Sequence, residues 1–100
     1  MIIVAVEVKV AAGAAEHAKD AIAKMETATR AEEGCITYAF SLDLSDPTTI
    51  RVIERWRSLE DIKAHMVSPH MSDFNKAMMA IRPQGLDVKA YEIAHEVALG

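Results

Sequence analysis

The stretch CITYAFSLDLSDPTTIRVIERWR, residues 35–57, decides the fold of this chain. Its first part, residues 35–43, alternates as a strand does, with one face made of Ile36, Tyr38, Phe40 and Leu42. Residues 43–48 are rich in turn-forming residues, so we expect the chain to reverse there. In residues 49–57 the alternation resumes, with one face made of Ile50, Val52, Glu54 and Trp56. These residues therefore predict an antiparallel hairpin.

The residues before this hairpin predict a strand followed by a long helix. Residues 2–10 alternate, and one face of that strand carries Val4, Val6, Val8 and Val10. Gly13 ends the strand, and apolar residues at helical spacing then predict a helix over residues 14–33. Gly34 stands where a glycine commonly ends a helix, at the C′ position.

The residues after the hairpin predict a helix in two parts and a last strand. Ser58 is an N-cap residue for the first part, whose apolar stripe consists of Leu59, Ile62 and Met66. Ser68 and Pro69 then restart the helix, because serine caps a helix and proline fits its first turn. The second part runs to Ile81 and has an apolar stripe made of Met71, Phe74, Met78 and Ile81. Residues 87–97 predict the last strand, with one face made of Tyr91, Ile93 and Val97.

The predicted order of elements is β-α-β-β-α-β, with the second helix broken at Pro69. Two β-α-β halves in 100 residues specify a ferredoxin-like α+β sandwich, in which a four-stranded antiparallel sheet carries its helices on one face. We expect residues 1–100 to form a single domain. The other sheet face would be bare in a monomer although it carries several apolar residues, and we therefore predict a homodimer.

Composition excludes several classes of partner. Lys and Arg number 11 against 15 Asp and Glu, and the formal net charge is −4, so no nucleic acid is expected as a partner. No apolar run reaches the roughly 18 residues of a membrane span, so no membrane partner is expected either. A single cysteine cannot form an intramolecular disulfide, which favours a reducing, cytoplasmic location.

Four histidines are the first candidates for chemistry. His65 and His70 are five residues apart, about 140° around a continuous helix, and a proline separates them. This spacing matches no common metal motif, so we expect no metal site. The sequence also contains no glycine-rich phosphate loop, nucleophile elbow or Cys-x-x-Cys motif. Cys35 is expected to be a small buried hydrophobe rather than a nucleophile.

Three motifs occur in an order that resembles one protein family. Residues 33–38 follow E-G-C-x-x-Y, residues 54–56 follow E-x-W, and residues 64–70 follow A-H-x-x-[ST]-P-H. Each motif is weak alone, but the ordered set resembles the antibiotic biosynthesis monooxygenase (ABM) domain, and its small quinol monooxygenases in particular. The resemblance implies ferredoxin-like halves that form a dimeric α+β barrel, in agreement with the fold predicted from the pattern.

The resemblance implies an oxidoreductase of an unusual kind, a cofactor-independent monooxygenase. Such enzymes oxidise a quinol or polycyclic phenol with O₂ and use no metal, flavin or haem. The deprotonated substrate supplies the electrons, so the protein has to provide a base, a dry pocket and polar groups that hold the anion. The expected partners are therefore a small aromatic or quinol-type substrate and O₂, with no cofactor.

Five side chains are candidates for this site. His65 is the candidate catalytic base, or a donor that holds the anion, because histidine exchanges protons near neutral pH. The candidates for substrate binding are Tyr38, Trp56, Met66 and Phe74. Each of the five has a structural alternative: His65 would tie the helix break to nearby backbone, and the others would fill the core. We expect Glu54, on an otherwise apolar strand face, to have a structural partner.

Two other functions remain open. The first is isomerisation of a small phosphorylated hydroxyketone, which relatives with a similar His-x-x-[ST]-Pro-His segment catalyse. It requires converging cations, whereas Arg51, Arg55 and Arg57 are expected on the face opposite the pocket. The second is a non-catalytic dimeric small-ligand-binding domain, because a fold alone does not fix a function. Haem oxygenation is not expected, since the haem-degrading branch has an asparagine in its first strand and this chain has none there.

Overall fold

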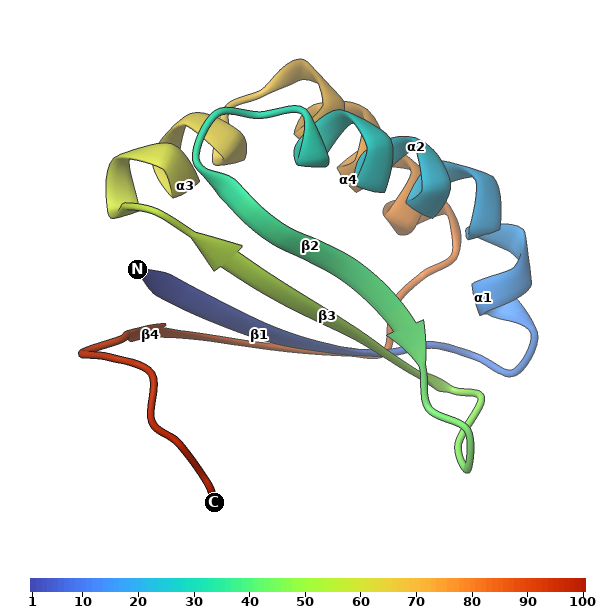
Figure 1. Cartoon of the computed structure of the whole chain (residues 1–100). Coiled ribbons are helices and arrows are strands. Elements are labelled where there is room, and N and C mark those ends of the chain that lie inside the picture. Colours follow the sequence, from blue (N-terminus) through green and yellow to red (C-terminus); the bar gives the residue numbers. More distant parts are fainter.

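A four-stranded antiparallel sheet organises the structure, a computed structural model that describes residues 1–100 (Figure 1). The strands lie in the order β2-β3-β1-β4. In chain order the elements are β1 (Ile2–Lys9), α1 (Ala14–His17), α2 (Lys19–Arg30), β2 (Cys35–Leu42), β3 (Thr49–Trp56), α3 (Leu59–Met66), α4 (Pro69–Ala80) and β4 (Gly85–Glu92). The predicted ferredoxin-like α+β fold is confirmed.

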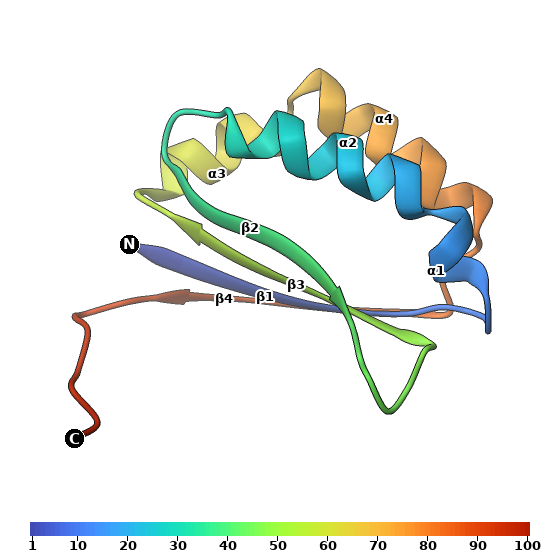
Figure 2. The ribbon, with the colours of Figure 1, turned by 45° about the vertical axis from the view of Figure 1, so that its right-hand side comes forward.

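The helices cover one face of the sheet and leave the other face open (Figure 2). None of them combines the length and the apolar character that a membrane span requires. The buried side chains of the covered face fall into two groups. The aliphatic cluster consists of Val8, Val10, Ala14, Ala18, Ile50 and Met78. The aromatic cluster consists of Val4, Met25, Tyr38, Val52 and Trp56.

Two serine caps divide the second helical region as predicted. The Ser58 side chain accepts a hydrogen bond from the backbone N–H three residues later and starts α3. The Ser68 side chain does the same for α4, whose first residue is Pro69. Proline is tolerated there because the first N–H groups of a helix have no partner within it. The break places His65 in α3 and His70 in α4.

The first helical region is shorter and more divided than predicted. A single helix over residues 14–33 is wrong, because α1 ends at His17 and α2 ends at Arg30. Gly34 therefore lies beyond the helix end, in the turn that enters β2, where its φ is +88°. A Cβ atom at this position would come within 2.2 Å of the Asp61 side chain. Glycine thus lets the turn both adopt this φ and pack against α3.

A β-bulge changes the alternation predicted for β2. The pairing of β2 with β3 shifts between Cys35 and Thr37, which makes Ile36 an extra residue. Cys35 consequently packs against the aromatic cluster, to which Tyr38 belongs, whereas Ile36 is 41% exposed. The prediction that Ile36 shares the inner face with Tyr38 is therefore wrong.

The last strand is shorter than predicted. It spans Gly85–Glu92, rather than residues 87–97, and pairs with β1 along its whole length. Val97 lies after the strand and is exposed, so the prediction that it shares a strand face with Tyr91 and Ile93 is wrong. Residues 93–100 run away from the helices, on the open side of the sheet (Figure 1).

Candidate functional site

The buried imidazole of His65 is the centre of the candidate site. His65 is 2% exposed and lies in α3. The centre of its ring lies 4.9 Å from that of Trp56, in β3, and 5.5 Å from that of Tyr38, in β2. The histidine therefore packs against two aromatic side chains of the sheet, and this surround limits the access of water to the ring.

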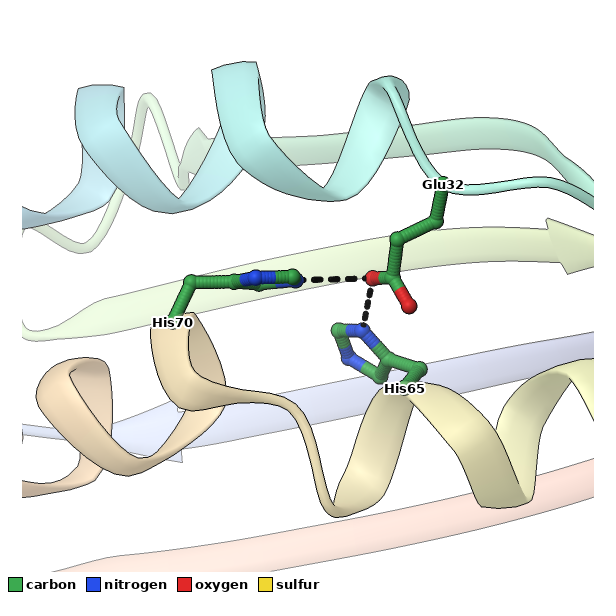
Figure 3. A group of neighbouring side chains, drawn as sticks. All are labelled: Glu32, His65 and His70. Carbon is green, nitrogen blue, oxygen red and sulfur yellow. Dashed lines mark hydrogen bonds and ion pairs between the residues drawn. The ribbon is translucent and has the colours of Figure 1, made fainter.

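The Glu32 carboxylate holds His65 and a second histidine from the same side. Its Oε2 atom lies 2.6 Å from Nδ1 of His65 and 2.8 Å from Nε2 of His70. Figure 3 shows both rings directed at this single oxygen, with Glu32 reaching down from the turn after α2. Side chains from α3 and α4 thus converge on one carboxylate, which comes from the turn after α2.

The hydrogen bond to Glu32 determines which nitrogen of His65 carries the proton. A carboxylate accepts hydrogen bonds, so Nδ1 is the donor, and the lone pair of the neutral ring is on Nε2. Nε2 makes no hydrogen bond within the chain. Because Thr29 Oγ1 is the only fully enclosed polar side-chain atom without a partner, Nε2 retains contact with the surrounding space. His65 thus presents an unoccupied basic nitrogen.

The convergence of the histidines follows from the helix break. On one continuous helix His65 and His70 would point in different directions, but His70 lies in the first turn of α4. Ser68 connects the two helices, since its hydroxyl donates to the His65 carbonyl oxygen at 2.7 Å while it caps α4. The expectation that the five-residue spacing keeps these side chains apart is therefore wrong. Their nitrogens and Glu32 lie within 4.8 Å of one another.

A second carboxylate, that of Glu54, lies beneath the aromatic rings. Trp56 donates its indole N–H to Oε1 of Glu54 at 2.9 Å, and this bond is the structural partner expected for Glu54. Burial raises the pKa of Glu54 above its ordinary value, against the opposing effects of the Trp56 hydrogen bond and of the nearby His65. The carboxylate therefore anchors the indole, and the indole N–H partly offsets the effect of burial on its ionisation.

Burial also raises the pKa of the Tyr38 hydroxyl, and the charges of Glu54 and Glu32 act in the same direction. Tyr38 is therefore a neutral hydroxyl that can donate a hydrogen bond. The Cys35 thiol has its pKa raised by the same causes, burial first and then the two glutamates. A protonated thiol is a poor nucleophile, in agreement with the structural role expected for Cys35.

The structure brings some of the candidate residues together and separates others. His65 contacts both Tyr38 and Trp56. Phe74 lies in α4, with its ring centre 5.4 Å from that of Phe40, and borders a groove of about 450 Å³ between α2 and α4 that His70 also lines. Met66 is 58% exposed, so its predicted place in the buried apolar stripe of α3 is wrong, whereas its place in the pocket wall stays a prediction.

Glu32 is the residue that sequence reasoning missed. The motif over residues 33–38 draws attention to Glu33, but Glu33 is exposed and the preceding residue turns inward. The backbone N–H of Glu32 donates to the Thr29 carbonyl at 3.0 Å, which fixes the turn in this direction. Two adjacent glutamates before a glycine were the available signal, and only the path of the turn distinguishes them.

The arginines of β3 lie away from this site. Arg51 bonds to Asp43 at 2.5 Å, and Arg55 Nε bonds to the Thr37 hydroxyl at 2.8 Å, both exposed on the open side of the sheet. These two arginines therefore do not supply the cation beside His65 that phosphate recognition by the phosphorylated-hydroxyketone alternative requires.

A buried histidine of α3, paired with a carboxylate and packed against the sheet, is the polar centre of this small α+β protein. The family described as antibiotic biosynthesis monooxygenase matches residues 1–77, and the chain belongs to this family.

Individual relatives agree with this assignment. Probable quinol monooxygenase YgiN from Escherichia coli K12 is 33% identical over 67 residues, which cover 59% of this chain and 64% of that protein. The match thus spans less than two thirds of the relative's length. A Deinococcus radiodurans protein assigned to the antibiotic biosynthesis monooxygenases superimposes with a TM-score of 0.91 at 27% identity, over 100% of this chain and 99% of that chain. Rv0793 from Mycobacterium tuberculosis shares the fold, with a TM-score of 0.84 at 22% identity over 97% and 98% of the two chains.

Proposed function

We propose that this chain is a cofactor-independent monooxygenase that oxidises a quinol or polycyclic phenol with O₂. The observation that carries the proposal is the buried His65, whose Nδ1 is hydrogen-bonded to Glu32 and whose Nε2 is free. Membership of the family and the similarity to a probable quinol monooxygenase support the reaction class. We further propose that residues 1–100 act as one domain.

In this proposal His65 is the general base. Its Nε2 accepts the proton of the substrate hydroxyl, and the Glu32 carboxylate stabilises the imidazolium ion that forms. The resulting substrate anion transfers one electron to O₂, and the two radicals recombine. One oxygen atom then enters the substrate and the other leaves as water, so a naphthoquinol with a free ring C–H gives a hydroxynaphthoquinone. The substrate provides all the electrons.

Tyr38, Trp56 and Phe74 form the proposed substrate contacts. Tyr38 remains protonated and donates to the substrate oxygen, while the Trp56 indole provides a flat apolar surface that Glu54 holds in place. Access runs past His70, whose side chain is 25% exposed, from the groove that Phe74 borders. A substrate contact by Met66, which is exposed, stays a prediction.

The test is O₂ uptake by the purified, EDTA-treated chain with a panel of naphthoquinols and anthrone-like phenols. We expect uptake above the uncatalysed rate with at least one of them. The His65→Ala variant should lower that rate by roughly 10²–10⁴-fold, the usual contribution of a general base. His17→Ala, which changes an exposed histidine of α1, is the matched control and should keep full activity. No uptake with any compound, or an unchanged rate in His65→Ala, would overturn the proposal.

We also propose a homodimer in which the open sheet faces of two chains pack together as an α+β barrel. The open face carries Ile3, Ala5, Ala39 and Ile53 from three adjacent strands, and Ile53 is 44% exposed. Light scattering after gel filtration should give twice the chain mass of 11.0 kDa. Ile53→Lys should shift the population to monomer, and a monomeric wild type would contradict the dimer. The unpaired Cys35 fits a reducing compartment such as the cytoplasm.

A further inference from the structure

The side chains of Glu32, His65 and His70 support a second role besides base catalysis. We propose that Glu32, His65 and His70 bind one divalent transition-metal ion, and that the bound ion inhibits the proposed monooxygenase by occupying Nδ1 of His65. The metal site stands on the geometry alone, whereas the inhibition rests on the proposed function.

The donor set has the composition and the proximity that such an ion requires. Two imidazole nitrogens and one carboxylate oxygen lie within 4.8 Å of one another. Imidazole suits Zn²⁺, Co²⁺, Ni²⁺ and Cu²⁺, and the carboxylate neutralises part of their charge. Three protein ligands leave coordination positions for water, so the set does not require a fourth residue.

Metal coordination requires the three donor atoms to rearrange around an ion. The two nitrogens lie 2.6 and 2.8 Å from Oε2 of Glu32. Donors around a tetrahedral ion stand about 3.3 Å apart, as metal–ligand bonds of about 2.0–2.2 Å dictate. Glu32 therefore has to withdraw by roughly half an ångström, and the two histidine nitrogens, which lie within 4.8 Å of each other, have to come to about the same 3.3 Å separation. It lies in the turn between α2 and β2, outside both elements, and so its side chain can move without disturbing either.

The site can be reached although His65 itself is buried. The side chain of His70 is 25% exposed and that of Glu32 is 17% exposed, compared with 3% for His65. An ion therefore meets His70 and Glu32 first and reaches Nδ1 of His65 by replacing the proton in the hydrogen bond to Glu32.

Metal binding at Nδ1 changes the base chemistry of His65. A neutral imidazole carries one proton, and an ion on Nδ1 leaves that proton on Nε2. Nε2 is then a donor and cannot accept a proton from the substrate. The same histidine therefore cannot hold the ion and act as the base at the same time.

Titration of the metal-free full chain with Co²⁺, followed by its visible d–d absorption, tests the site. We expect one ion per chain, displaced by Zn²⁺. Glu32→Gln and His70→Gln, at partly exposed positions, should each weaken Co²⁺ binding by at least roughly 10–100-fold, the cost known even for residues outside the ligand set. His17→Gln and His95→Gln are the matched controls, because both histidines are exposed and remote in sequence. Binding that only the controls weaken, or that no variant weakens, would overturn the site.

A second experiment tests the inhibition. One equivalent of Zn²⁺ should suppress quinol-dependent O₂ uptake, and EDTA should restore it. In the His70→Gln variant, the same amount of Zn²⁺ should lower the rate of O₂ uptake by a smaller factor than in the wild type. Undiminished O₂ uptake by the Zn²⁺-loaded chain would overturn the proposed inhibition, and the proposed metal site would still stand. No O₂ uptake by the metal-free chain would overturn the proposed function and the inhibition with it, and the Co²⁺ spectra would still decide the site.

Discussion

The two clusters on the covered face of the sheet differ in what they bury. The aliphatic cluster, around Val10 and Ile50, contains apolar side chains alone. The aromatic cluster adjoins four buried or nearly buried polar groups, those of Thr29, Glu32, Glu54 and His65. One sheet face thus combines an end that contributes stability with an end whose polar groups reduce it. The comparison shows that the polar groups of the candidate site lie at one end of the core, beside the aromatic cluster.

The polar groups beside the aromatic cluster depend on specific hydrogen-bond partners. A buried polar group costs free energy unless it has a hydrogen-bond partner. Glu32 has two histidine partners and Glu54 has the Trp56 indole, but the Thr29 hydroxyl has none. Each pairing that holds the site can therefore be perturbed without removing apolar contacts.

The largest effect on stability is expected at the aliphatic end. Ile50 is 2% exposed, and Ile50→Ala should lower the free energy of unfolding by about 2–5 kcal/mol, since it leaves a cavity among apolar neighbours. Met66→Ala, at an exposed position of α3, is the control and should change it by less than about 0.5 kcal/mol. Urea unfolding measures both. Equal losses would contradict the assignment of Ile50 to the buried core.

A somewhat smaller loss of stability is expected from a substitution in the turn between α2 and β2, which also carries Glu32. Gly34→Ala should cost about 1–3 kcal/mol from backbone strain alone, and more because the new Cβ meets the Asp61 side chain. Gly13→Ala is the matched control, since φ is +83° there and no atom lies within 4 Å of the added Cβ. If chemical unfolding shows the same loss for both, the contact with α3 has no energetic weight.

The pH dependence of stability tests the buried Glu54 carboxylate beside the aromatic cluster. Burial raises the folded-state pKa of Glu54 above the ordinary value of 4.5. Between these two values the folded chain binds more protons than the unfolded chain, so stability falls as pH rises above about 4.5. Glu54→Gln keeps an acceptor for Trp56 and should remove this part of the slope, as measured by unfolding from pH 4 to 7. A slope that the substitution leaves unchanged would show that Glu54 ionises normally.

The smallest expected effect is a gain. Thr29→Val replaces a buried hydroxyl by a methyl group of similar shape. The hydroxyl makes no hydrogen bond of normal geometry, although it lies close enough to Tyr38 to oppose the rise of the Tyr38 pKa, so the substitution should raise the free energy of unfolding by about 1 kcal/mol. The same thermal or urea measurement applies. A loss of similar size would mean that the hydroxyl has a partner that stabilises the helix–sheet contact.

Local chemistry explains the parts of the fold that were predictable from the sequence. The alternation of β3 and the caps at Ser58 and Ser68 depend on neighbouring residues alone, and all three were read correctly. The bulge at Ile36 was not predictable, because it depends on how β2 registers with β3. Alternation carries no information on an extra residue.

The candidate site was predictable only in part, for a related reason. His65, Tyr38 and Trp56 come from motifs with their own spacing, and the structure places them in contact. The choice of Glu32 over Glu33 depends on the path of a turn, and the approach of His70 depends on the angle at a helix break. Spacing along the chain encodes neither.

The central claim is that Glu32 fixes the proton of His65 on Nδ1 and leaves Nε2 free to act as a base. Long-range ¹H–¹⁵N correlation spectra of the metal-free chain distinguish the two ring nitrogens directly and replace an assignment made from hydrogen-bond geometry. The account predicts a proton on Nδ1 and a bare Nε2 in the neutral ring of His65. A proton on Nε2 would contradict it.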